Sequence, residues 1–132
     1  MTNLNARHDM GKLVLRLALG ILVLLHGIAK LKNGLGPIEG MLQGHDLPTF
    51  LAYGAYIGEV LGPLLLIAGF HARIGAALVA INMLFALGLA HAGQLGQLNE
   101  AGGWAVELQA LFLFTAAAIA LLGPGRYSVN QR

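Results

Sequence analysis

Four long apolar segments, separated by short polar breaks, dominate the sequence. They cover residues 13–31, 50–70, 74–92 and 104–122, and each is roughly 19–21 residues long, the length that a helix needs to cross the hydrocarbon core of a bilayer. Helical structure is required because lipid offers no hydrogen-bond partner to a free backbone group. The pattern predicts an all-α protein, a four-helix transmembrane bundle that forms one domain over residues 1–132.

The breaks between the segments predict how the helices connect. Glycines and a proline at residues 34–37 end the first helix, and residues 38–42 are expected to form one amphipathic turn at the interface. The break at residues 69–73 is very short, which predicts an antiparallel hairpin of the second and third helices, and neighbouring helices are expected to be antiparallel throughout. Gly-Pro-Gly at residues 123–125 stops the fourth helix.

Composition supports a lipid-facing exterior and excludes several classes of function. Hydrophobic residues make up 57% of the chain and charged residues 11%, whereas soluble domains average about 45–50% and about 25%. The net charge is only +2 and no basic run is present, so nucleic acid is not an expected partner. Cysteine is absent, which excludes disulfides, thiolate metal sites and thiol-relay chemistry within this chain.

The basic residues predict the orientation in the membrane. Six lie on the side of the two termini, against two (Lys30 and Lys32) on the other side; the six are Arg7, Lys12, Arg16, Arg73, Arg126 and Arg132. Positive charge favours the cytoplasmic side, so both termini are predicted to be cytoplasmic. Arg16, Arg73 and Arg126 are expected at that edge, where long side chains can reach lipid phosphates.

Ionisable residues inside the spans are expensive and tend to pair or line a cavity. Because alternate helices run in opposite directions, His26, Lys30, Glu59, His91 and Glu107 fall at similar depths in the outer half of the bilayer. We expect Lys30 to pair with Glu59 or Glu107, with His26 in the same cluster, because a carboxylate without a cation would be driven to protonate. The alternative is a set of polar groups that only fix helix register.

Pro63 adds a second feature beside Glu59. It lies four residues later and cannot donate to the Glu59 carbonyl, so the helix should bend and leave a free acceptor there. Tyr56 lies about one turn earlier. A bend, a free carbonyl, a carboxylate and a phenol together indicate a binding spot; a bend that serves packing alone is the alternative.

The histidines also raise the question of a haem or metal site. His26 and His91 lie at similar depth on different helices, as a bis-histidine haem requires. His45 and His71 fall in loops, and no tight metal-ligand spacing is present. We therefore expect neither a metal site nor a covalently bound cofactor.

Several motifs resemble those of one family of membrane proteins. Residues 25–31 (LHGIAKL), residues 59–62 (EVLG) leading to residues 69–73 (GFHAR), and residues 121–128 (LLGPGRYS) occur in the order and spacing of the DoxX family. The resemblance runs from about Leu13 to Asn130. His71 is a departure, because the family more often has an aromatic residue or threonine nearby.

The resemblance implies a multi-pass four-helix bundle in the bacterial inner (cytoplasmic) membrane. It also implies a link to respiratory or oxidant chemistry, since family members are associated with quinol oxidase and thiosulfate–quinone oxidoreductase complexes and with resistance to oxidants. The family's recurrent polar residues fall on these positions: His26, Lys30, Glu59, Arg73, Glu107 and Arg126.

Three functions remain open on the sequence. The first is an accessory subunit of a quinone-linked redox complex or oxidant-resistance system, with redox subunits as partners and a quinone as the candidate ligand. The second is a transporter or exporter of small molecules, and the third is a membrane scaffold or assembly protein. A homo-oligomer is a candidate assembly for any of the three, because small bundles often associate. The candidate ligand-binding residues are His26, Lys30, Tyr56, Glu59, His91 and Glu107.

Overall fold

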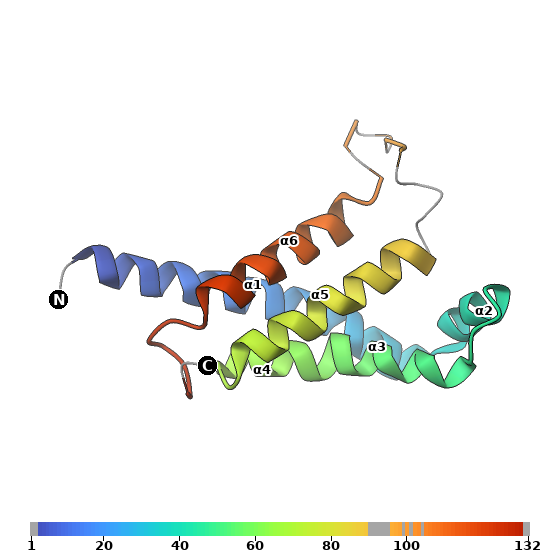
Figure 1. Cartoon of the computed structure of the whole chain (residues 1–132), viewed down its shortest axis with the longest axis horizontal. Helices are drawn as coiled ribbons and strands as arrows, with labels where there is room; N and C mark the ends of the chain where they lie inside the picture. The colour runs from blue at the N-terminus through green and yellow to red at the C-terminus, as the bar shows by residue number, and fades with distance from the viewer. Residues whose placement is uncertain (1–2, 90–95, 99, 101, 104, 131–132) are drawn as a thin grey trace.

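Every regular element in the described part of the chain is a helix. The computed structural model describes residues 3–89, 96–98, 100, 102–103 and 105–130, and these contain no β-strand (Figure 1). The elements are α1 (Asn3–Asn33), α2 (Gly36–Gly44), η1 (Thr49–Tyr53), α3 (Gly54–Tyr56), η2 (Ile57–Leu61), α4 (Gly62–Ala68), α5 (Ala72–Leu89) and α6 (Glu107–Leu122). The 3₁₀-helix η1, α3, the π-helix η2 and α4 follow one another without a break.

Two of the four predicted spans are long and apolar enough to cross a membrane. They are Ala6–Asn33 and Thr49–Ala68, with mean hydropathies of 2.0 and 1.6. Only 28% and 33% of their most apolar windows are buried, whereas the core helix of a soluble protein is mostly buried, so these surfaces suit lipid. The other two apolar helices are shorter, Ala72–Gly88 and Glu107–Leu122.

The fourth predicted helix begins later in the structure than the sequence indicated, and the predicted end of the third lies outside the described residues. The third predicted segment ended at residue 92, but residues 90–92 lie outside the described part of the chain. The fourth was predicted to begin at residue 104, which also lies outside that part, whereas α6 begins at Glu107. Hydropathy alone placed this start too early, because apolar residues continue before the first helical turn.

Two glycines on α1 allow its backbone to approach the η2–α4 segment closely. A Cβ atom on Gly27 would overlap the carbonyl oxygen of Glu59, and one on Gly20 would lie 3.1 Å from the carbonyl oxygen of Pro63. Because the higher-numbered glycine meets the lower-numbered carbonyl, the two helices are antiparallel. Small residues are what close helix approach in a membrane requires.

The hairpin between α4 and α5 was predicted and is present. Gly69 ends α4 with φ 70°, His71 also has a positive φ of 47°, and α5 begins at Ala72. A Cβ on Gly75 would lie 2.8 Å from the carbonyl oxygen of Gly62. Further along the hairpin, a Cβ on Gly58 would overlap the side chain of Asn82.

The α6 helix completes the main core by packing against α5 and α1. The core is made of these buried residues: Leu19, Val23, Leu66, Ala72, Ala76, Val79, Met83, Phe112, Ala116 and Ile119. After α6 the chain returns to the first turns of α1, where the backbone N–H of Arg126 donates to Asp9 Oδ1 at 3.3 Å. The start of α1 and the end of the described chain therefore lie at the same end of the molecule (Figure 1).

The α2 helix lies at the opposite end (Figure 1). The sequence predicted one amphipathic turn there, and the structure has a longer helix with Pro37 in its first turn. Leu42 of α2 and Leu35, which comes directly before α2, are buried against Ala52 and Ala55. This second small cluster also contacts Tyr56, so it supports one wall of the candidate site.

Candidate functional site

A π-helical turn places Glu59 opposite α1. Pro63 has no backbone N–H, so it cannot complete the usual bond to the Glu59 carbonyl. The N–H of Gly62 bonds instead to the carbonyl of Ile57, five residues back, within η2. The predicted bend is therefore a π-turn, a feature found frequently at functional sites. It leaves the Glu59 carbonyl facing Gly27, as described above.

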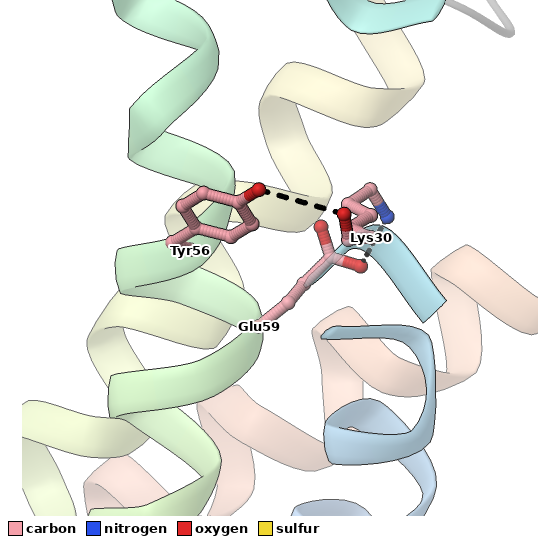
Figure 2. A network of polar contacts seen from close by, with 3 residues as sticks. All are labelled: Lys30, Tyr56 and Glu59. Carbon is pink, nitrogen blue, oxygen red and sulfur yellow. Dashed lines mark hydrogen bonds and ion pairs between the residues drawn. The ribbon is translucent and has the colours of Figure 1, made fainter. Parts of the chain in front are cut away.

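Lys30 and Glu59 form an ion pair between α1 and η2. Lys30 Nζ lies 2.6 Å from Glu59 Oε1, and the two side chains are 27% and 7% exposed (Figure 2). Of the two carboxylates that the sequence offered to Lys30, the structure selects Glu59. The close approach at Gly27 explains the choice, because it brings the η2 backbone beside α1 one turn before Lys30.

Tyr56 lies beside this pair, on the same continuous helical segment as Glu59 (Figure 2). It is half-buried, and its hydroxyl donates to the backbone carbonyl of Lys30 at 3.4 Å, a long hydrogen bond (Figure 2). A hydroxyl held this loosely can turn to another acceptor at small cost. The three side chains thus place an ammonium, a carboxylate and a phenol at one junction of α1 with the α3–η2 segment.

An apolar groove runs beside the junction. It has a volume of about 320 Å³ and is open to the exterior. Its lining consists of Leu31, Tyr56, Ile57, Val60, Leu61 and Leu64. Tyr56 belongs to both the groove and the polar junction, and Leu31 follows Lys30 directly, so the groove and the polar groups are contiguous.

The remaining predicted site residues do not join the Lys30–Glu59 pair within the described chain. His26 was expected in the cluster, but its ring is exposed and packs edge-to-face on Phe112 of α6, with centroids 5.8 Å apart. Glu107 is exposed in the first turn of α6, with its carboxylate beside Gly103. His91 lies outside the described residues.

The angular position of His26 on α1 explains its separation. Residues turn by about 100° each along a helix, so Lys30 points about 60° away from the direction of Gly27 and His26 about 100° away. Gly27 faces η2, so the long Lys30 side chain can reach Glu59 while the shorter imidazole is directed toward α6.

Replacing His26 by alanine is expected to have a small effect. The variant loses one aromatic contact, which is worth about 1 kcal/mol or less at an exposed position. Equilibrium unfolding in detergent measures this loss. A loss several times larger, or a change in the energetic coupling between Lys30 and Glu59, would place His26 in the polar cluster after all.

Arg16 is a polar residue whose environment the sequence did not predict. It was expected at the membrane edge with Arg73 and Arg126, and those two are exposed. Arg16 is only 1% exposed, and its Nη2 donates to the Tyr127 carbonyl at 2.7 Å. The sequence carries no signal for this burial, because the covering residues lie 111 positions away along the chain.

Comparison with known proteins gives two matches. The model of the DoxX family matches residues 11–92, which include Lys30, Tyr56 and Glu59. A Bacillus subtilis (strain 168) protein named "Putative oxidoreductase CatD" is 31% identical over 120 residues, which cover 91% of this chain and 84% of that protein. No solved structure gives a significant match.

Proposed function

Because the chain belongs to the DoxX family, we propose that it is an accessory subunit of a quinone-linked redox system in the bacterial inner membrane. In this proposal α1, the η1–α4 segment, α5 and α6 all cross the bilayer as one four-helix bundle. Both termini lie in the cytoplasm, and the quinone headgroup binds beside Lys30 and Glu59.

The membrane arrangement is supported by the surfaces and charges of the helices. Large apolar side chains are exposed on every one of these helices, including Leu25, Leu64, Phe85 and Phe114. The end that carries Asp9 and Arg126 also holds most of the basic residues, which favours the cytoplasmic side. Crossing by α5 and α6 is part of the proposal, since these two helices are shorter than a standard span.

The quinone assignment is supported by the chemistry of the junction. A quinone needs hydrogen-bond donors for its carbonyl oxygens and an apolar channel for its isoprenoid tail. The Lys30 ammonium and the Tyr56 hydroxyl are donors, and the adjoining groove is apolar and open to the exterior. Pockets for small molecules typically combine a mostly apolar lining with a few convergent polar groups.

A bound quinone supplies two-electron redox chemistry, and this chain would supply binding and orientation. Glu59 accepts a hydrogen bond from Lys30 at 2.6 Å and so holds the ammonium beside the groove. The sequence carries no redox-cofactor motif, so electrons are assigned to a partner subunit. The name of the Bacillus subtilis relative supports a redox setting for the protein.

The observation that carries the proposal is the Lys30–Glu59 pair beside an apolar groove whose lining includes Tyr56, the third member of the polar junction. We expect protein purified from its native membranes to retain quinone, and the Glu59→Gln variant to lose most of it. Glu39→Gln is the matched control, because Glu39 is an exposed carboxylate on α2. Quinone is extracted from equal amounts of each protein and quantified by chromatography, and copurifying subunits are identified by mass spectrometry.

Two results would contradict the proposal. The first is native protein free of quinone and of redox subunits. The second is the same quinone content in Glu59→Gln as in the unmodified protein. Proton-coupled uptake of a small molecule by vesicles that contain only this protein would favour the transporter alternative instead.

A further inference from the structure

Arg16 is a buried cation with unsatisfied donors, far along α1 from the Lys30–Glu59 pair. Its side chain is 1% exposed, and only Nη2 has a partner, the carbonyl oxygen of Tyr127. Nε and Nη1 are buried and have no hydrogen-bond partner among the described residues. Isolated buried charges are costly, and such groups are normally paired. The described residues therefore satisfy only part of the hydrogen-bonding capacity of the Arg16 guanidinium.

The residues around Arg16 supply no carboxylate to it. The turn between α4 and α5 lies on one side, where a Cβ on Gly69 would overlap Arg16 Nη1. The C-terminal segment 123–130 lies on the other side and offers only the Tyr127 carbonyl. Asp9, an acidic residue near the start of α1, accepts a hydrogen bond from the backbone N–H of Arg126. No carboxylate forms an ion pair with Arg16 in the described part of the chain.

The surroundings favour an anion. The side chain of Lys12 approaches Gly125, since a Cβ there would lie 3.2 Å from Lys12 Cβ. The guanidinium of Arg73 similarly lies against Gly123. The eighteen-residue helix α5 begins at Ala72, directly after the turn that contacts Arg16, and a helix N-terminus favours negative charge. Two guanidinium groups, the stem of a lysine and a helix N-terminus thus lie at one end of the molecule.

We propose that Arg16 binds a phosphate oxyanion at this end of the molecule. The planar guanidinium presents several N–H donors that match the geometry of phosphate oxygens. Arg16 lies three residues after Leu13, the predicted start of the first apolar segment, so a phosphate bound at this site would lie near the predicted edge of the membrane. The phosphate can come from the headgroup of an anionic phospholipid or from free phosphate, and both present the same oxygens to Nε and Nη1.

Entry of the phosphate requires displacement of the C-terminal segment, which polar contacts hold to α1 and to the α4–α5 turn. Among these contacts, the Tyr127 carbonyl accepts from Arg16, Asp9 Oδ1 accepts from the Arg126 N–H at 3.3 Å, the Gly69 carbonyl accepts from the Asn130 N–H at 3.3 Å, and the Asn130 side chain accepts from the His71 N–H at 2.9 Å. A phosphate oxygen can replace the Tyr127 carbonyl on Nη2 while it also satisfies Nε or Nη1. The exchange therefore adds hydrogen bonds to Arg16.

The test uses the full-length protein in a neutral detergent with two probes. Inorganic phosphate and short-chain phosphatidylglycerol are titrated separately, and binding is followed by native mass spectrometry and by the shift in thermal unfolding temperature. Arg16→Lys keeps the charge but loses the planar donor array, and we expect it to weaken binding at least tenfold. Arg7→Gln removes an exposed cation from the same helix, and we expect it to leave binding unchanged.

The outcomes separate the two sources and decide the proposal. Saturable binding of inorganic phosphate identifies a free phosphate, whereas saturation by phosphatidylglycerol alone identifies a lipid headgroup; either supports the proposal if Arg16→Lys weakens it. Absence of saturable binding of both probes to the unmodified protein overturns the proposal, and this arm needs no variant to fold. Equal binding to Arg16→Lys and to the unmodified protein also overturns it.

Discussion

Replacement of Gly27 by alanine is expected to lower the free energy of unfolding by about 2–3 kcal/mol. The added Cβ would overlap the Glu59 carbonyl oxygen and would lie 3.0 Å from Val60 Cγ2. A backbone carbonyl cannot rotate away as a flexible side chain can, so α1 and η2 must move apart. Equilibrium unfolding of the purified protein in mixed detergent micelles measures the loss.

Gly11→Ala is the matched control for this prediction. Gly11 lies on the same helix, is exposed, and has no neighbouring atom within 4 Å of an added Cβ. Alanine should stabilise the helix there by about 0.5–1 kcal/mol, because it restricts the unfolded chain more than glycine does. If the two variants had equal stabilities, α1 would not approach η2 at Gly27 as the structure shows.

Of the two charges in the Lys30–Glu59 pair, removal of the Lys30 ammonium is expected to lower the free energy of unfolding more. Lys30→Met leaves Glu59, 7% exposed, without its cation, and loss of one partner of a buried pair costs about 3 kcal/mol or more. Glu59→Gln should cost less, because the freed ammonium is already 27% exposed and sits on a flexible stem that can reach water. Lys32→Met, at an exposed position of the same helix, is the control.

The double variant Lys30→Met/Glu59→Gln separates the pair from each side chain alone. A coupling energy of about 1–2 kcal/mol is expected, since contacting charged residues are not additive. Additive losses in the two single variants would show that the 2.6 Å contact contributes nothing to stability. The same set of proteins can then be used for ligand measurements, because their relative stabilities are known.

The sequence predicted the features that depend on local pattern. The short break after Ala68 indicated the α4–α5 hairpin, and Pro63 indicated a bend at Glu59, because both follow from backbone chemistry within a few residues. The pairing of Lys30 with Glu59 was one of two alternatives, because helix rise gives the depth of each residue. The assignment of all four segments as membrane spans remains a prediction, and two of the helices are long and apolar enough to cross a membrane.

Two features could not be predicted from the sequence. One is the direction in which each side chain points around its helix, and the other is the burial of a residue by a segment far away along the chain. His26 was grouped with Lys30 because the two lie one turn apart on one face of the helix at similar depth, but the glycine contact at Gly27 sets which face of α1 meets η2, and His26 turns toward Phe112. Arg16 was expected to reach lipid from the membrane edge. Its burial depends on the return of the C-terminal segment over α1, and no local pattern encodes that path.

The most direct test of the proposed quinone site is photo-crosslinking with a quinone analogue that carries a reactive group on its ring. We expect adducts on peptides that contain Lys30 or Tyr56. These adducts should be lost in Glu59→Gln and on addition of excess native quinone. Adducts confined to α5 or α6, or adducts that excess quinone does not reduce, would contradict it.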